Sequence, residues 1–377
     1  MKKRLLVFQR ALAPYSIDFY NDLNAAFDAD IYFFRKNLRS QKFDMNKLLS
    51  QLNFTPKFLT FGFELRHKGR LIRFGYLKKV VQFKPDIILV WEYNIISFFT
   101  ALFTKIVYPK TKVYSLCDDS VDVAITSSTL RRIGRFLCFK VLDGIVLDNE
   151  LAEQWYNKHF PDVKTTVFPI IQKEERILSI INVSDSITQG YINQYKLIDK
   201  DVLLFVGRLV EVKNLRFLID VFSSYVAINK NAVLILVGDG DKKSELLKMV
   251  EEVKIQDNII FAGRFEHKEL YAWYRAADYF ILPSIWEPFG AVVNESLIAG
   301  TPVLCSNLAG ATCLINNENG VTFNPFDKDE LLSILNEVFC KKRNSFNNIS
   351  TRNSLMPYTF NQKMQELISF LVEADFE

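Results

Sequence analysis

The sequence predicts an α/β protein made of two doubly wound domains. Short apolar runs alternate with helix-length segments along most of the chain, and this rhythm stops near residue 172 and restarts at Val202. Strands that are apolar on both faces are typical of parallel sheets, because helices cover both faces of such a sheet. The length of 377 residues is also about twice that of a common single domain. We therefore predict two domains, each with its own parallel sheet.

The first domain is predicted to span residues 1–175. Its predicted strands are the apolar runs at residues 5–8, 31–34, 87–91, 113–116 and 144–147. An apolar stretch at residues 95–108 is interrupted by Lys105 and is shorter than the roughly 20 residues that cross a bilayer, so we predict a buried helix. The first strand follows Met1-Lys-Lys-Arg directly, and its apolar run is too short for the core of a signal peptide.

The second domain is predicted to span residues 176–356. Its predicted strands are the apolar runs at residues 202–206, 233–237, 259–261, 279–282 and 303–305. The more polar residues 172–200 contain no strong strand and are the predicted linker and first irregular part of this domain. Beyond Pro357, apolar residues recur at helical spacing at Met364, Leu367, Ile368 and Leu371. This closing helix, at about 357–377, is predicted to pack back on the first domain.

The composition argues against several classes of protein. Lysine and arginine number 47 against 43 aspartate and glutamate residues, so the clustered positive charge of a dedicated nucleic-acid-binding protein is not expected. The five cysteines are odd in number and include no C-x-x-C pair, which argues against a disulfide framework or a zinc ribbon. We therefore expect a protein of a reducing cytoplasm.

The most informative window follows the predicted strand at residues 279–282. It reads L-P-S-I-W-E-P-F-G-A-V-V-N-E, with Glu287 in a loop and Glu295 on the short helix that the loop enters. Gly290 lets a ligand approach the backbone, and the free N–H groups at a helix start attract anions. Two such carboxylates are suited to hold hydroxyl groups at two ends of an extended ligand, and a sugar nucleotide has that shape. The alternative is a pair of solvated carboxylates favoured by the helix dipole.

A second window follows the predicted strand at residues 202–206. Here Gly207, Arg208 and Lys213 precede a helix that is predicted to begin near Leu215. In open α/β sheets the carboxyl ends of the strands line the ligand crevice. A guanidinium and an ammonium at this edge can neutralise a diphosphate leaving group, which in other enzymes is done by Mg²⁺. Ordinary surface charge is the alternative interpretation.

These two windows, joined by L-V-G-D-G at residues 236–240 and F-A-G-R at residues 261–264, resemble the donor-binding half of glycosyltransferase family 4. The likeness covers roughly residues 202–325, and the family's E-x7-E signature falls on Glu287 and Glu295. The family consists of retaining enzymes with the GT-B fold, so the resemblance implies two Rossmann-like domains that face each other across a cleft. It also implies a hexosyltransferase-type enzyme, with residues 1–175 on the acceptor side and residues 176–356 binding a nucleotide-sugar donor.

The resemblance implies a role for each matched residue. Glu295 would hold the ribose hydroxyls, and Glu287 would contact the transferred sugar. Arg208 and Lys213 would hold the diphosphate. The other matched donor-binding positions, of which the last three would offer backbone groups to the sugar and phosphate, are Gly207, Phe289, Gly290 and Ala291.

The amino-terminal half departs from the family pattern. Residues 9–16 contain no glycine where the family has a glycine-rich loop, and the family's usual histidine is replaced within S-L-C-D-D-S at residues 115–120. Asp118 is our candidate for orienting the acceptor hydroxyl. The alternative is an ordinary aspartate at a strand end or helix cap.

No metal or cofactor is expected. The D-x-D pairs at residues 28–30, 239–241 and 327–329 are of a kind frequent in loops and caps, and the three histidines are isolated in the sequence. The predicted function is a cytoplasmic, metal-independent retaining glycosyltransferase, which acts on a glycan or lipid-linked glycan acceptor in surface polysaccharide biosynthesis. Two alternatives stay open: a retired transferase that serves as a binding or scaffold subunit, and another GT-B enzyme such as an epimerase or phosphorylase.

A basic and aromatic segment lies between Lys57 and Lys84 (residues 57–84). It carries eight lysine or arginine residues against one acid, Glu64. One interpretation is peripheral attachment to the anionic inner face of the cell membrane, because basic side chains are attracted to anionic lipid and exposed aromatic rings can enter the interface. The alternative is a solvated helix with its apolar residues in the core.

Overall fold

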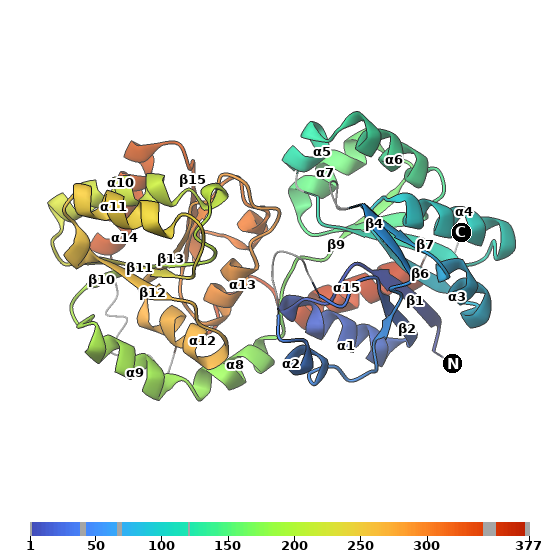
Figure 1. Cartoon of the computed structure of the whole chain (residues 1–377), viewed down its shortest axis with the longest axis horizontal. Helices are drawn as coiled ribbons and strands as arrows, with labels where there is room; N and C mark the ends of the chain where they lie inside the picture. Colours follow the sequence, from blue (N-terminus) through green and yellow to red (C-terminus); the bar gives the residue numbers. More distant parts are fainter. Residues whose placement is uncertain (1, 38–42, 66–69, 120, 342–351, 374–377) are drawn as a thin grey trace. The chain divides into compact units, whose positions relative to one another are not determined.

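The computed structural model describes residues 2–37, 43–65, 70–119, 121–341 and 352–373 (Figure 1). The chain divides into two compact units. Unit 1 consists of Met1–Ile171 and Phe360–Glu377, and unit 2 is the continuous segment Gln172–Thr359. Our predicted boundaries fall at residues 175 and 356.

Unit 1 is built on a seven-stranded sheet in the order β3-β2-β1-β6-β7-β8-β9. All of its pairings are parallel. The strands are β1 (Arg4–Gln9), β2 (Asp28–Phe33), β3 (Lys57–Phe58), β6 (Ile87–Trp91), β7 (Lys112–Cys117), β8 (Gly144–Leu147) and β9 (Lys164–Val167). The strand order reverses between β1 and β6, and a reversal of this kind opens a crevice at the carboxyl ends of the two strands.

The helices of unit 1 come from both ends of the chain. They are α1 (Ile17–Ala26), α2 (Met45–Leu49), α3 (Tyr76–Phe83), α4 (Ile95–Val107), α5 (Val121–Thr126), α6 (Thr129–Phe139), α7 (Glu150–His159) and α15 (Phe360–Glu373), with the short η1 (Pro14–Ser16) before α1. The closing helix α15 buries Met364, Leu367 and Leu371. The ring of Phe360 packs on Phe168 with centroids 5.6 Å apart, so the last helix of the chain completes the core of unit 1.

Unit 2 is built on a six-stranded, all-parallel sheet in the order β12-β11-β10-β13-β14-β15. Its strands are β10 (Asp201–Val206), β11 (Ala232–Val237), β12 (Ile259–Gly263), β13 (Tyr279–Leu282), β14 (Val303–Ser306) and β15 (Gly320–Phe323). Its helices are α8 (Glu174–Asn182), α9 (Asp185–Gln194), α10 (Leu215–Ile228), α11 (Lys243–Glu252), α12 (His267–Ala276), α13 (Ala291–Ile298) and α14 (Lys328–Cys340), with the short η2 (Glu211–Lys213), η3 (Gln256–Asn258) and η4 (Gly310–Leu314). The two doubly wound α/β domains predicted from the sequence are confirmed, and the predicted linker is largely helical, as α8 and α9.

One expectation for unit 1 is only partly right, and another is wrong. The stretch at residues 95–108 is helical, as α4, but it is buried on one face only, because Ile95, Phe99 and Ile106 are 59%, 45% and 74% exposed. Residues 57–84 do not form one solvated helix. They contain β3, an antiparallel hairpin of β4 (Gly62–Leu65) and β5 (Arg70–Arg73), and then α3.

The basic side chains of residues 57–84 are not all on the surface. Arg73 is buried, and its Nε donates a hydrogen bond of 3.1 Å to the carbonyl oxygen of Phe34. Burial lowers the pKa of this guanidinium below its usual value. Arg73 therefore cannot contact lipid, whereas Arg66 and Lys68 lie outside the described residues. Among the residues that are described, no helix combines the length and the apolar character that crossing a bilayer needs.

Candidate functional site

The two predicted donor-binding windows meet at the reversal of strand order in unit 2. Strands β10 and β13 are neighbours in the sheet although β11 and β12 lie between them in the sequence. The loops that follow them start at the same sheet edge, and the amide of Ile285 donates a 3.0 Å hydrogen bond to the carbonyl of Val212. Ligands of open α/β sheets bind at such a reversal. The candidate site is therefore the pair of loops at residues 207–214 and 283–290.

Lys213 and Glu287, which are 74 residues apart in the sequence, form an ion pair in this site. Their side chains are only 13% and 16% exposed. Lys213 ends η2, and Asn214 then takes a left-handed backbone conformation (φ 55°) before α10 begins. The sequence predicts both residues as site residues but assigns them to different parts of the ligand, so their mutual pairing is a new feature of the structure.

The loop that carries Glu287 is fixed by the segment after β14. The amides of Gly310 and Ala311 donate hydrogen bonds of 3.1 and 2.8 Å to the carbonyls of Glu287 and Phe289. A side chain at position 310 would meet the carbonyl oxygen of Pro288 at 2.1 Å, so only glycine fits. Phe289 is buried and Gly290 has a φ of 104°, which places Ala291 at the start of α13.

Glu295 lies on α13 and is partly buried. Burial raises the pKa of Glu295 to about 7, and this rise is partly opposed by the hydroxyl of Tyr274, by Gln172 and by Arg176. The Tyr274 hydroxyl donates to Glu295 Oε2 at 3.1 Å. Tyr274 is a residue that the sequence analysis missed, because it lies on α12 and only the fold brings it to Glu295.

Arg208 and Gly207 occupy the start of the loop after β10. Gly207 continues the strand, with its amide donating to the carbonyl of Val237 at 2.9 Å, and Arg208 is exposed. The loop packs tightly on the loop after β11, since the amide of Leu209 donates to the carbonyl of Asp239 at 3.0 Å. A Cβ atom at Gly238 would lie 1.8 Å from the Gly207 carbonyl oxygen, and the φ of Gly238 is 144°. Glycine at position 238 is therefore required for the two loops to pack this closely against each other.

We expect Gly238→Ala to lower the unfolding free energy of unit 2 by at least about 2 kcal/mol, because the new methyl group collides with backbone and the φ is unfavourable. Thermal unfolding followed by circular dichroism measures this effect. Gly190→Ala is the matched control, because Gly190 lies within α9 with nothing within 4 Å of the added methyl group. The control should raise stability by about 0.5–1 kcal/mol. Equal stability of the two variants would contradict the tight packing of these loops.

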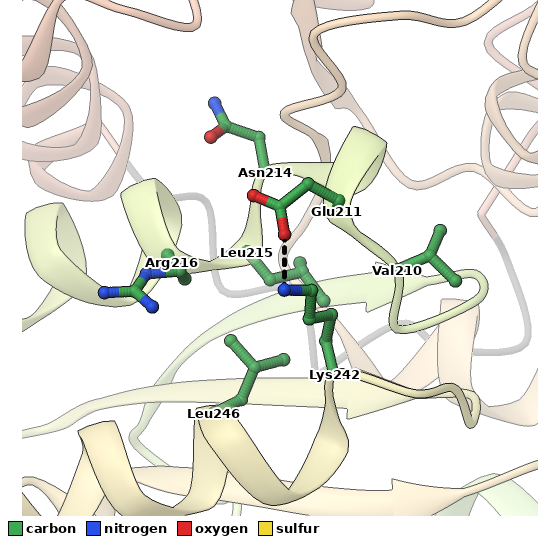
Figure 2. A pocket seen from close by; sticks show the side chains of 7 residues that line it. All are labelled: Val210, Glu211, Asn214, Leu215, Arg216, Lys242 and Leu246. Atoms are coloured by element: carbon green, nitrogen blue, oxygen red, sulfur yellow. Dashed lines mark ion pairs between the residues drawn. The ribbon is translucent and has the colours of Figure 1, made fainter.

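A shallow pocket lies beside the same loop and is lined by Val210, Glu211, Asn214, Leu215, Arg216, Lys242 and Leu246 (Figure 2). Its central contact is the ion pair between Lys242 Nζ and Glu211 Oε2, at 2.6 Å. Lys242 also lies 3.0 Å from Glu245. None of the predicted catalytic or donor-binding residues lines this pocket, and its ammonium group already has two carboxylate partners. We therefore assign the candidate site to the loops around Lys213 and Glu287.

Asp118, the acceptor-side candidate, lies in unit 1. It is exposed and follows β7. Next to it in the fold is Glu92, which follows β6 at the strand-order reversal of unit 1 and has a φ of 48°. Burial, and then the negative charge of Asp118, raise the pKa of Glu92 to about 8. The sequence analysis missed Glu92. The feature that could have identified it is its position directly after a strand that lies at the reversal of strand order.

The neighbouring Asp119 has a structural role. It is buried, lies 2.6 Å from Arg131, and accepts a 2.8 Å hydrogen bond from the Tyr156 hydroxyl. Asp148, at the end of the next strand, is also buried, and burial together with the charge of Asp118 raises its pKa well above the usual value. Carboxyl groups with displaced pKa values thus gather at the carboxyl edge of this sheet, which is a feature of functional sites.

Metal ligands do not gather anywhere in the part of the chain that the structure describes. Within it, no three histidine, cysteine, aspartate or glutamate side chains are grouped so that they could hold a metal ion. The D-x-D pairs have local roles instead. Asp239 accepts from the amide of Gly240, and Asp327 caps α14 by accepting from the amide of Glu330.

Comparison with known proteins gives the candidate site a context. Residues 192–353 match the sequence model of the family described as glycosyl transferases group 1. An uncharacterised glycosyltransferase of Methanocaldococcus jannaschii is 33% identical over 134 residues, which is 35% of this chain and 34% of that protein. The glycogen synthase of Mycobacterium tuberculosis is 32% identical over 137 residues, or 36% of this chain and 33% of that protein. The chain thus spans about a third of the length of these curated relatives.

Solved structures resemble the whole chain. The crystal structure of Anabaena HepE in complex with UDP has a TM-score of 0.75 and 19% sequence identity, and the match covers 98% of this chain and 100% of that one. At this identity the likeness concerns the fold alone. The chain therefore has the GT-B fold, and its residues 192–353, which contain Lys213, Glu287 and Glu295, carry the sequence pattern of the group 1 glycosyltransferases.

Proposed function

We propose that this protein is a retaining glycosyltransferase of family 4, whose unit 2 binds a nucleotide-sugar donor. The observation that carries the proposal is the convergence of Lys213 and Glu287 at the strand-order reversal of unit 2, inside the segment that matches the group 1 family. A cation and a carboxylate side by side suit a ligand that has a diphosphate next to a hydroxyl-rich ring. Glu295 lies on α13, the helix that follows the Glu287 loop, and it is the proposed partner of the ribose hydroxyls.

The proposed reaction breaks the bond between the sugar's anomeric carbon and the diphosphate. Lys213 and Arg208 stabilise the negative charge that develops on the departing diphosphate, and Glu287 holds the sugar hydroxyls. The acceptor oxygen then attacks the anomeric carbon on the face from which the diphosphate departs. Its proton passes to an oxygen of the leaving phosphate, so the configuration is retained and no protein nucleophile is needed.

The acceptor side is proposed to use the carboxyl edge of the unit 1 sheet. Asp118 is exposed there, and Glu92 beside it has a pKa of about 8, so one of the two carries a proton near neutral pH. Such a pair offers both a hydrogen-bond donor and a charged acceptor to a hydroxyl group. Asp118 orients the acceptor hydroxyl in this proposal, and we propose that Glu92 assists it.

The donor can be identified by titration calorimetry. UDP is the first probe, because Anabaena HepE was crystallised with UDP, and other nucleoside diphosphates and their sugars follow. Binding to the wild-type protein and loss of binding in Glu295→Ala supports the proposal. Product stereochemistry, read by NMR from an α-linked donor sugar, tests retention. An inverted product would refute the retaining mechanism and leave donor binding intact.

We propose that transfer does not require a metal ion, because Lys213 and Arg208 supply the positive charge at the diphosphate. The expected result is unchanged release of UDP from the donor in excess EDTA. Complete and reversible loss of UDP release with EDTA would contradict this proposal.

Three other functions predict different outcomes in the same assays. A retired transferase that acts as a scaffold would release no nucleotide from any donor, whether or not it binds one. A GT-B epimerase would release UDP or change the sugar without an acceptor, and a phosphorylase would depend on inorganic phosphate. Acceptor-dependent release of UDP without phosphate distinguishes the proposed transferase from all three.

The proposed acceptor is a glycan or lipid-linked glycan of surface polysaccharide biosynthesis, and the proposed location is the cytoplasm, at the inner face of the cell membrane. Exposed aromatic side chains within residues 57–84 support the proposed membrane location. Phe61, Phe63 and Phe74, around the β4–β5 hairpin, are 78%, 52% and 47% exposed, and Phe74 packs between the other two rings at 5.9 and 6.2 Å. Exposed aromatic clusters next to basic side chains favour a lipid interface.

A further inference from the structure

Helix α6 exposes most of its large apolar side chains and buries an arginine, which is unusual for a helix on the surface of a globular protein. Such a helix normally buries its apolar stripe and exposes its charged side chains. In α6 the buried positions are Arg135, Cys138 and Phe139, whereas its other four large apolar side chains are exposed. The exposed ones, with their exposed fractions, are Leu130 (63%), Ile133 (51%), Phe136 (54%) and Leu137 (43%).

The buried arginine is held by a specific network, so this orientation of α6 is firmly set. Arg135 donates to the hydroxyl of Tyr156 at 3.2 Å and to the carbonyl of Ala124 at 2.9 Å, and it lies 4.0 Å from buried Asp119. Arg131 reaches the same Asp119 at 2.6 Å. Turning α6 to bury its apolar stripe would break these charged contacts, and removing one partner of a buried pair is costly.

The exposed stripe runs along one side of α6, and the neighbouring helix α4 also exposes apolar side chains. Leu130, Ile133 and Leu137 are three and four residues apart, which puts them on one helix face. Helix α4 packs beside α6 (Figure 1) and exposes its own apolar side chains, Ile95, Phe99, Ile106 and Val107. We call the exposed apolar residues of these two helices the α4–α6 face. Large exposed apolar side chains that gather on two neighbouring helices indicate an interaction site.

The charge around the α4–α6 face indicates what covers it. Neither α4 nor α6 contains an acidic residue. Arg132 and Lys140 are exposed, and the ammonium group of Lys140 lies 5.3 Å from the centroid of the Phe136 ring. Lys105 of α4 is 40% exposed while it pairs with Asp143. Apolar and aromatic side chains with cations at their edge are complementary to an anionic lipid surface, where the rings enter the interface and the cations meet headgroups.

We propose that the α4–α6 face is the surface by which unit 1 docks on an anionic lipid bilayer. The proposal rests on the membrane location proposed above but not on the proposed reaction, because docking requires neither donor nor acceptor. It also differs from attachment through residues 57–84, since it names other helices and other side chains. Ile133 and Phe136 insert into the interface, and Arg132 and Lys140 contact anionic headgroups.

Vesicle sedimentation tests the proposal. The full chain is mixed with vesicles of phosphatidylcholine containing phosphatidylglycerol, or with vesicles of phosphatidylcholine alone. Wild-type protein should pellet with the first and not with the second. Ile133→Ser with Phe136→Ser should weaken binding at least about tenfold, because two exposed side chains lose their transfer into the interface. Arg132→Ser with Lys140→Ser should weaken it to a similar degree and make the rest of the binding less sensitive to salt.

Unit 2 offers a matched control. Ile228 and Phe326 are 64% and 67% exposed, so Ile228→Ser with Phe326→Ser removes the same residue types outside the α4–α6 face. This variant should pellet like the wild type. All variants change exposed side chains, and unaltered thermal unfolding confirms that each is folded.

Several outcomes would overturn the proposal. One is wild-type binding by the Ile133→Ser, Phe136→Ser variant, and another is equal pelleting with neutral vesicles. Loss of binding in Phe61→Ser with Phe74→Ser alone would place the contact on the β4–β5 hairpin. If analytical ultracentrifugation shows a dimer that the Ile133→Ser, Phe136→Ser variant dissociates, without any vesicle binding, the face is an interface between copies of this chain.

Discussion

Lys213→Met should lower turnover by about 100-fold or more and leave the overall fold intact. Lys213 is the proposed counter-charge of the departing diphosphate, and removing one preorganised electrostatic group from an active site costs about 10²–10³ in turnover. The ion pair with Glu287 adds a second effect, because Glu287 loses its partner at a position where its side chain is only 16% exposed. Release of UDP from the donor measures turnover.

Two further variants separate a catalytic role of Lys213 from a purely structural one. Lys242→Met is the matched control, because Lys242 is also a lysine paired with glutamate beside the same loop, but it belongs to the shallow pocket and not to the candidate site. Its turnover should stay at the wild-type level. In Lys213→Met with Glu287→Gln the unpaired charge is gone. If this double variant regained full turnover together with its stability, Lys213 would be needed only to balance Glu287, and the assignment to the diphosphate would be wrong.

Glu295→Gln should weaken UDP binding by about tenfold or more at pH 8, because a ribose hydroxyl donates better to a carboxylate than to an amide, and hydrogen bonds to charged groups contribute about 1.5–3 kcal/mol. In the wild type the contribution of Glu295 to UDP binding depends on pH. Burial raises the pKa of Glu295 to about 7, so at pH 6 most of this group is protonated and cannot accept from two hydroxyls. We therefore expect wild-type affinity to fall about tenfold from pH 8 to pH 6.

Calorimetric titration of both proteins across this range is the test, and the variant corrects for titration of UDP itself, because the ligand is the same. An identical pH dependence in wild type and Glu295→Gln would exclude Glu295 from the nucleotide site.

The raised pKa of Glu295 also affects the stability of the protein. Because the native pKa lies above the unfolded value of 4.5, the native state holds the proton more tightly, and wild-type stability falls as pH rises from about 4.5 to 7. Glu295→Gln should lack this fall in thermal unfolding.

The sequence predicts the central strands of both sheets and the edge strand β12, but it misses the edge strands β3, β9 and β15, for one physical reason. Central parallel strands such as β10 and β11 are buried on both faces and read as continuous apolar runs. The edge strands β9 and β15 expose part of their residues, so K-T-T-V and G-V-T-F have no such run. Their place is defined only by the neighbouring strand, which a local pattern does not contain.

Some residues of the proposed sites can likewise be recognised in the sequence, and others only in the fold. Lys213, Glu287 and Glu295 are recognisable because each lies in a loop or helix entry whose residue types and spacing are specific. Glu92 is not, because a glutamate after an apolar strand becomes notable only when the strand order places it at the reversal. The exposed stripe of α6 was also missed, because helical periodicity shows that a helix is two-sided but not which side faces the core. Buried Arg135 and Asp119 decide that, through a contact with no signature in the sequence.

The return of the chain to unit 1 at Phe360 determines the order in which the protein can fold during synthesis. Unit 2 is one continuous segment, and its residues 172–359 are synthesised between the two parts of unit 1. Until α15 is made, unit 1 lacks the helix that covers Phe168, and Gly144, whose added Cβ would lie 3.1 Å from the Phe370 ring, faces an unfilled place. Synthesis proceeds at about 5–20 residues per second, so α15 is made on the order of ten seconds or more after the first part of unit 1. During that interval the core of unit 1 is open while unit 2 is being made, and a chaperone then has an apolar surface of unit 1 to bind.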